Sequence, residues 1–348
     1  MILSNKNIPF GTLPYETVEA VTRMQAKLFD KNPFLPFLPK IVENDDIVKR
    51  TFTSIPGVTF KGKKIYLKIG TPEYKQSLEK LDKAYNKASK FALEPYAIES
   101  PFFDKFLDLL KKFQSPNATV NLLGPFTISQ MLMNAAEEQI LADKSFRKLF
   151  IQSVAVKALW AIEKVKEVSP KTVPIILLEE PLYGQFGMIK RANEEVTAEL
   201  VTSVFAKVIE RIKQSGALVA IHCKDKCDWK IPINAGVDII SFDAYNNPNN
   251  LCIIPEAVID FINRGGIINW AVVPVMNESL VKSLNIDFVT NRLIGTLEGL
   301  VIAGVPRDLV YKSAVVSVQG DTDHLPLIFA EKAFILSSQL SKKIPIKG

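Results

Sequence analysis

The stretch ALVAIHCKDKCDWKIPINAGVDIISFDA, residues 217–244, decides the fold class. It contains two apolar runs, 217–221 and 237–242, and each run ends in a polar residue, His222 and Asp243. Both runs are continuously apolar rather than alternating, which is typical of parallel strands that are buried on both faces. Parallel strands need long crossover connections, so the stretch predicts repeated units of strand and helix.

The same unit repeats through the second half of the chain. Further strands are predicted by continuous apolar runs at 174–178, 267–273 and 313–318. Helices are predicted by apolar residues at helical spacing at 194–214, 255–264, 287–303 and 326–340. Gly216 and Gly304 follow two of these helices as stop signals, and Pro255 opens another at a position where a missing N–H does no harm.

The first half is less regular. Strands are predicted at 8–13, 96–99 and 119–123, and a long helix at 143–167. These strands bring the total to eight, so the sequence predicts a single (β/α)8 TIM barrel domain over residues 1–348. A doubly wound open sheet is the alternative, but such folds usually carry a Gly-rich first turn, which this sequence lacks.

Two segments of the first half lie outside the repeat. The segment 58–69 has the pattern of an added N-terminal β-hairpin, with Gly62 between two short runs. The Pro-rich segment 32–40 predicts a rigid loop. Neither segment changes the assignment of the chain as an α/β barrel.

Composition excludes several classes of protein. Hydrophobic residues make up 47% of the 348 residues, which is enough for a large core. The net charge of +6 comes from scattered lysines without a basic block, so we expect no nucleic-acid binding. Three cysteines cannot all pair, no signal peptide is evident, and no apolar run reaches the ~18 residues of a membrane span. We therefore expect a soluble, cytoplasmic protein that does not enter a membrane.

Polar residues follow several of the predicted strands. In a barrel the functional groups lie at the carboxyl ends of the strands, so we expect these residues to share a pocket: Thr12, Glu179, Glu180, His222, Asp243, Trp270 and Asp321. A carboxylate at such a position can hold a ligand amine or act as a general base. The alternatives are that these residues cap the following helices, or that Glu179 forms a salt bridge with a neighbouring lysine or arginine.

The densest cluster of metal-ligating residue types is His222, Cys223 and Cys227. A histidine and two cysteines within six residues can ligate zinc. On a regular strand, however, the adjacent His222 and Cys223 face opposite ways, and Cys227 reaches the same site only if its loop curls back. The alternative is a solvated loop with incidental cysteines.

Several of these motifs together resemble a known family. They are Gly11-Thr12-Leu13-Pro14, the loop 33–39 (PFLPFLP), Gly124-Pro125-Phe126-Thr127, Glu179-Glu180-Pro181, the His222-Cys223…Asp228-Trp229 loop and the segment 238–245 (DIISFDAY). The chain resembles the barrel superfamily of cobalamin-independent methionine synthase and uroporphyrinogen decarboxylase, above all the short single-barrel core methionine synthase-like proteins. The resemblance runs from Pro9 to Ser341. The decarboxylase branch fits less well, because its Arg-rich first loop has no counterpart at 11–16.

The resemblance implies methyl transfer to a thiol such as homocysteine, with a zinc ion that turns the thiol into a thiolate. His222 and Asp243 match two of the family's zinc ligands. Lys224 stands where the family has the second ligand, a cysteine, and no cysteine stands near 318–320, where the last ligand belongs. Cys223 or Cys227 would have to complete the set, so the zinc site is degenerate and we expect zinc to be absent or weakly bound.

The resemblance also implies a ligand and a partner. The ligand is a small thiol or amino acid, with Glu179 holding its amine and with Thr12 and Trp270 beside it. Longer family members use an additional N-terminal barrel to hold a folate donor, so a short member implies another methyl donor, such as a methylcorrinoid protein. The alternative is a non-catalytic barrel that binds a ligand or a partner.

Overall fold

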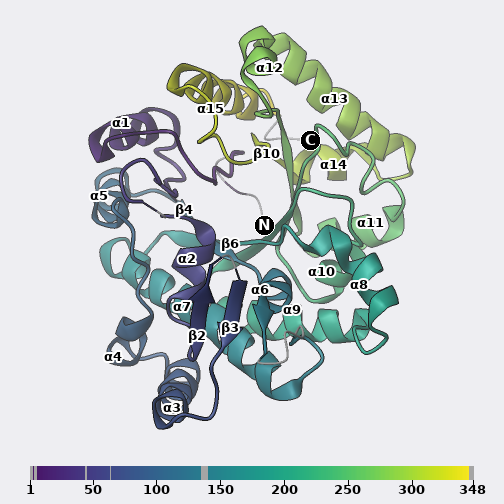
Figure 1. Ribbon diagram of the computed structural model, residues 1–348. Coiled ribbons are helices and arrows are strands. Elements are labelled where there is room, and N and C mark those ends of the chain that lie inside the picture. Colours follow the sequence, from purple (N-terminus) through teal and green to yellow (C-terminus); the bar gives the residue numbers. More distant parts are fainter. Residues whose placement is uncertain (1–2, 4–5, 44, 63, 135–139, 345–348) are drawn as a thin grey trace.

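The protein, described by a computed structural model over residues 3, 6–43, 45–62, 64–134 and 140–344, is built on a curled parallel sheet with helices outside it (Figure 1). Seven strands form the sheet in the order β1 (Phe34–Leu35), β4 (Asn117–Leu123), β6 (Val173–Glu179), β7 (Leu218–Cys223), β8 (Ile239–Phe242), β9 (Ile267–Val273) and β10 (Ala314–Val318). Every neighbouring pair is parallel. The carboxyl ends of the strands therefore meet at one edge.

Helices fill the crossovers between these strands. The longer ones are α1 (Val18–Leu28), α3 (Pro72–Lys87), α5 (Phe103–Phe113), α7 (Lys144–Val168), α9 (Ala198–Lys213), α11 (Pro255–Asn263), α13 (Ile286–Ile302) and α15 (Leu327–Ser341). Shorter helices lie in the connections: α2 (Ile47–Phe52), α4 (Lys90–Leu93), α6 (Pro125–Met131), α8 (Phe186–Ala192), α10 (Lys230–Asn234), α12 (Glu278–Ser283) and α14 (Arg307–Ser313). Side-chain caps fix several starts, as where Thr197 accepts a hydrogen bond from the Leu200 N–H at the start of α9.

The strands predicted at 119–123, 174–178, 217–221, 237–242, 267–273 and 313–318 are confirmed as β4, β6, β7, β8, β9 and β10, but the second predicted strand, 96–99, is wrong. Glu94–Tyr96 forms a short 3₁₀ helix, and residues 97–99 do not belong to a strand. The strand lies instead at Phe34–Leu35, within the segment predicted as a rigid loop. The Gln25 side chain hydrogen-bonds the backbone of β1. Its amide donates to the Phe34 carbonyl and its oxygen accepts from the Phe34 N–H. This two-residue strand is thus held by β4 and by the Gln25 side chain.

The predicted first strand, 8–13, is an irregular segment rather than a strand of the sheet. Asn7 forms an isolated parallel bridge with Val316 of β10, and Thr12 forms one with Phe37, just beyond β1. Between the two bridges lie Pro9, which lacks an N–H, and Gly11, whose φ of +104° breaks the extended conformation. The segment thus contacts both ends of the seven-stranded sheet.

The predicted added hairpin is confirmed. β2 (Val58–Lys61) and β3 (Lys64–Leu67) pair in an antiparallel fashion, with Lys63 of the turn outside the described residues. A third strand that the sequence analysis did not predict, β5 (Leu132–Met133), pairs in parallel with β3. The hairpin is therefore part of a small separate sheet.

Buried apolar side chains form two layers. The larger cluster lies between the sheet and the helices, and it includes Val219, Ile221 and Cys223 of β7. The smaller cluster contains the alternate residues Leu218 and Ala220 of β7 with their counterparts on β6, β8, β9 and β10, and no helical residue. This smaller cluster therefore marks the inner face of the curled sheet. Within the described residues, no helix combines the length and apolar character needed to cross a membrane.

Candidate functional site

Charged side chains gather at the carboxyl ends of the strands. We call Glu179, Lys224, Asp243 and Asp321 the strand-end group. The Lys224 ammonium lies 3.2 Å from the Asp321 carboxylate. Burial alone would lower the pKa of Lys224, but Asp321, Glu179 and Asp243 outweigh it and raise that pKa. The group therefore consists of one cation, Lys224, and three carboxyl groups that stabilise its charge.

Thr12 fixes the Asp321 carboxylate from the opposite side. The Thr12 N–H and hydroxyl both donate to Oδ1 of Asp321 at 2.9 Å. Gly11 permits this approach, because a Cβ there would lie 3.2 Å from the same oxygen. Burial would raise the pKa of Asp321, but the Lys224 ammonium and the two Thr12 donors hold it below its usual range. Thr12 thus binds a residue of the group.

Glu179 is buried at the end of β6, with 9% of its surface exposed. The Asn121 amide of β4 donates to its Oε1 at 2.9 Å. Burial, and then the nearby Asp321 carboxylate, raise the pKa of Glu179 to about 7. Its charge therefore depends on whether a cation lies beside it.

The adjacent Glu180 has a different role. Its carboxylate accepts hydrogen bonds from the N–H groups of Phe126 and Thr127 and from the Thr127 hydroxyl, at the start of α6. Gly124 leaves room for it, since a Cβ there would lie 2.2 Å from the Glu180 carboxylate. Burial raises the pKa of Glu180 to about 7. Glu180 thus caps α6, the helix that follows the neighbouring strand β4, and not a helix that follows its own strand as the alternative interpretation expected.

A row of polar side chains lies on the inner face, between the strand-end group and the apolar layer. Asn269 donates to the hydroxyls of Ser241 and Ser317, and the Ser241 hydroxyl lies 2.8 Å from Nδ1 of His222. Burial lowers the pKa of His222 to about 3, so its ring is neutral at physiological pH. The Ser241 hydroxyl accepts from Asn269 and can also donate its own hydrogen to Nδ1. In that arrangement the ring proton of His222 lies on Nε2.

Three polar atoms of this region have no hydrogen-bond partner among the residues that the structure describes. They are Asn121 Oδ1, His222 Nε2 and Asn269 Oδ1. All three side chains are at least nine-tenths buried, on the inner face of the sheet. An unpaired polar atom in such a place costs about 1–3 kcal/mol. The inner face therefore carries two amide oxygens and one ring nitrogen whose hydrogen-bonding capacity is unused.

A large cavity opens on the same edge of the sheet, between the loops that follow β6, β7 and β8. Its volume is about 920 Å³, which is ample for a small molecule. Its lining includes Cys227, Trp229 and Asn246. Asn246 also donates to the Asp243 carboxylate at 2.8 Å, so the cavity adjoins the strand-end group.

The residues predicted to hold zinc lie on two faces of the sheet. His222 packs on the inner face, 4.6 Å from the Phe10 ring. Cys223 is buried in the outer layer, with Cys227 packed against that layer. Burial and the neighbouring Cys223 thiol raise the pKa of Cys227, which favours the thiol over the thiolate. Over the described part of the chain, no three His, Cys, Asp or Glu side chains are placed to hold a metal ion together.

Asp243 is also committed to other partners. It accepts from the N–H groups of Tyr245 and Asn246, and from the side chains of Asn246 and Gln319. Gln319 lies where the family's last zinc ligand is expected, and it donates to Asp243 at 2.7 Å. Since Lys224 adds an ammonium to the same group, these residues do not fit the family's zinc site.

The structure places Trp270 away from the strand-end group. Its side chain is fully buried in the outer layer, with its ring 5.2 Å from that of Phe242. Register explains this, because Trp270 pairs with Phe242 while Asn269 pairs with Ser241 on the inner face. The neighbouring residue Asn269 thus faces inward, while Trp270 faces the outer layer.

Four functional residues were not predicted from the sequence: Asn121, Ser241, Asn269 and Ser317. The last three interrupt mainly apolar strands, IISF, IINWAVV and AVVSV, and Asn121 follows Asn117 and Thr119 in the strand NATVNLL. Such an interruption was the available signal, because an isolated polar residue in a buried strand needs a partner. Which face it occupies follows only from the register.

Comparisons with known proteins bear on the fold. No family model and no curated protein match this chain. Its structure is similar to that of a Listeria monocytogenes protein assigned as a vitamin-B12-independent methionine synthase, with a TM-score of 0.53 and 11% identity over 94% of this chain and 86% of the other. A β-N-acetylhexosaminidase covers 96% of this chain and 71% of its own, with a TM-score of 0.46 and 9% identity. The first likeness shows a mixed α/β fold similar to a TIM barrel.

Proposed function

We propose that this chain is a methionine synthase-like barrel that binds a small thiol or amino acid at the carboxyl ends of its strands. The closure of the barrel rests on the segment 6–13, which is irregular but takes the place of an eighth strand between β10 and β1. Ile8 donates to the Val316 carbonyl at 3.1 Å and Leu13 to the Phe37 carbonyl at 3.0 Å, so the segment joins β10 to the strand region at 34–37. The fold of the Listeria protein supports the same closure.

The observation that carries the ligand site is the set of unpaired atoms on Asn121, His222 and Asn269. A bound amino acid has the donors and acceptors that these atoms lack. Glu179 lies beside them, and its raised pKa favours a cationic partner. A ligand ammonium would restore the charge of Glu179 and replace the water lost on burial. Glu179 would therefore hold the amine, with His222 donating through Nε2.

The activity proposed for this ligand is methyl transfer to a thiol such as homocysteine. No step is assigned to zinc, because the residues present do not fit the metal. The Lys224–Asp321 ion pair favours a second candidate, a non-catalytic barrel that binds a ligand or a partner, since an ammonium occupies the group that would otherwise receive a cation. The two candidates share the ligand site and differ in turnover.

Calorimetric titration with L-homocysteine and L-methionine tests the ligand site. The wild-type chain should bind at least one of them, and Glu179→Gln and His222→Ala should weaken binding at least tenfold. Glu199→Gln, an exposed carboxylate of α9, is the control and should bind as the wild type does. Absence of binding, or equal binding by all variants, would refute the proposal.

Turnover is tested separately. Methylcobalamin serves as a probe for the methylcorrinoid donor, and methionine formed from homocysteine is measured by mass spectrometry. Methionine formed by the wild type but not by Glu179→Gln supports the methyltransferase. Binding of homocysteine without methionine formation supports the non-catalytic barrel.

A further inference from the structure

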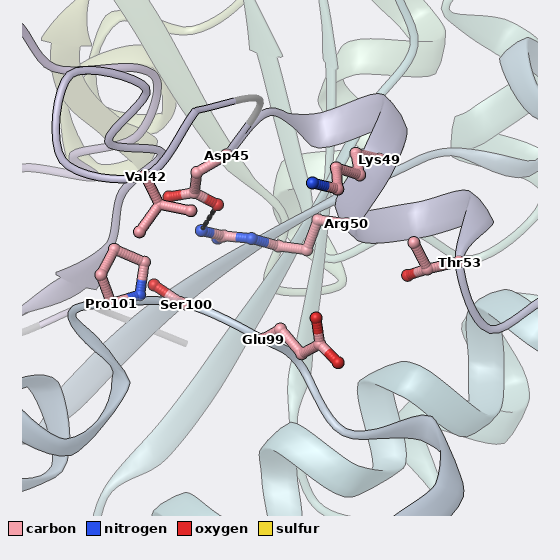
Figure 2. A pocket seen from close by; sticks show the side chains of 8 residues that line it. All are labelled: Val42, Asp45, Lys49, Arg50, Thr53, Glu99, Ser100 and Pro101. Carbon is pink, nitrogen blue, oxygen red and sulfur yellow. Dashed lines mark hydrogen bonds and ion pairs between the residues drawn. The ribbon is translucent and has the colours of Figure 1, made fainter.

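A second cavity, of about 280 Å³, lies between α2 and the segment 99–101 (Figure 2). Five of its lining residues carry polar or charged groups that a ligand could meet: Asp45, Lys49, Arg50, Thr53 and Glu99. None of the cavity's lining residues belongs to the strand-end group or to the polar row on the inner face. The cavity is therefore a separate feature, and its chemistry is independent of the function proposed above.

Arg50 is the unusual residue of this cavity, because its guanidinium is 96% buried yet only partly paired. Its Nη2 donates to Oδ1 of Asp45 at 2.8 Å and to the Pro36 carbonyl at 3.0 Å. The guanidinium carbon lies 4.0 Å from the centre of the Phe37 ring. Nε and Nη1 have no partner within the described ranges of the chain.

These unpaired N–H groups determine what the cavity would bind. Guanidinium has donors only, so its missing partner is an acceptor, and an anionic oxygen forms the strongest such bond. A buried charged donor without a partner also costs more than a neutral one. The Lys49 ammonium and the Thr53 hydroxyl line the same cavity and can bind further oxygens of such a ligand.

The charged side chains that line the cavity balance one another, because Arg50 and Lys49 are matched by Asp45 and Glu99. Attraction of an anion therefore comes from the unpaired donors rather than from net charge. The Lys157 ammonium donates to the Arg50 carbonyl, so it is a further cation close to Arg50. Glu99 is exposed and lies on the other side of Arg50 from Lys49, where its carboxylate opposes an incoming anion (Figure 2).

We propose that this cavity is a binding site for a small oxyanion, a carboxylate or a phosphate, held by one of the unpaired Arg50 N–H groups, at Nε or Nη1, and by the Lys49 ammonium. Its volume suits an ion of a few heavy atoms rather than a nucleotide or a peptide. The opposite signs of Lys49 and Glu99 then allow a test that does not depend on substitution of the buried arginine.

The test is calorimetric titration of the wild-type chain at low ionic strength with inorganic phosphate and, separately, with acetate. At least one should bind saturably, and the stronger of the two identifies the source of the oxyanion. Lys49→Gln should weaken binding about threefold, and Glu99→Gln should strengthen it by a similar factor, the range expected for a partly exposed charge. Arg50→Gln should abolish binding in a chain that still melts cooperatively.

Two controls separate this site from the others. Lys112→Gln removes an exposed lysine of α5 and should leave the affinity unchanged. His222→Ala alters the inner face of the sheet and should also leave it unchanged, so this site can fail while the thiol or amino-acid site holds. Failure of both anions to bind, or weaker binding by Glu99→Gln, would overturn the proposal.

Discussion

Lys157 is a buried cation whose titration should be visible in the stability of the protein. It lies in the middle of α7 with 2% of its surface exposed. Burial, and then the Arg50 charge, lower its pKa from 10.5 to about 8. Between these two pH values the unfolded chain holds the proton that the folded chain has released. The free energy of unfolding should therefore rise with pH across this window.

The magnitude follows from the shift. A change of about 2.5 units at ~1.4 kcal/mol per unit gives about 3.5 kcal/mol over the whole transition, of which about 3 kcal/mol is gained between pH 8 and pH 10.5. Lys157→Met removes the titrating group and keeps an apolar chain of similar length. The difference in unfolding free energy between the wild type and this variant should be constant below pH 8. It should then shift by about 3 kcal/mol in favour of the wild type by pH 10.5.

Urea unfolding followed by circular dichroism from pH 7 to pH 11 measures this difference. Other groups titrate in the same range, but they are shared by both proteins and cancel on subtraction. Lys148→Met is the matched control, because Lys148 lies on the same helix with its side chain 64% exposed. Its profile should run parallel to that of the wild type. Parallel profiles for Lys157→Met as well would refute the reasoning.

Further substitutions test the packing and the metal site. Gly124→Ala places a methyl group against Glu180 and should lower the unfolding free energy by about 1–3 kcal/mol in urea titration. Gly295→Ala, which meets open space on α13, should instead raise it by up to about 1 kcal/mol, and a loss would contradict this reasoning. We expect the purified chain to be mostly free of zinc and the Lys224→Cys variant to bind zinc more tightly, as measured by elemental analysis. One zinc per wild-type chain that is lost in His222→Ala would contradict this expectation.

The sequence by itself determined the repeated part of the fold. Six strands of the large sheet, β4 and β6 to β10, are mainly apolar runs, and the helices between them carry a distinct periodicity and clear stop signals, so local pattern and tertiary burial agree there. The hairpin was equally local, with Gly62 between two short runs. The sequence also indicated that Glu179, Asp243 and Asp321 follow strands, which put them at one edge of a parallel sheet.

Only the tertiary structure decided what each strand-end residue does. Side chains alternate across a strand, so a register difference of one residue separates Asn269 on the inner face from Trp270 in the outer layer. Glu180 became a helix cap and Lys224 a partner of Asp321 through contacts between distant segments. β1 is held by β4 and by the Gln25 side chain, which lie in other segments of the chain. The Arg50 cavity forms where the segment 99–101 approaches α2. Such pairings arise from packing between elements, which no local pattern of residues encodes.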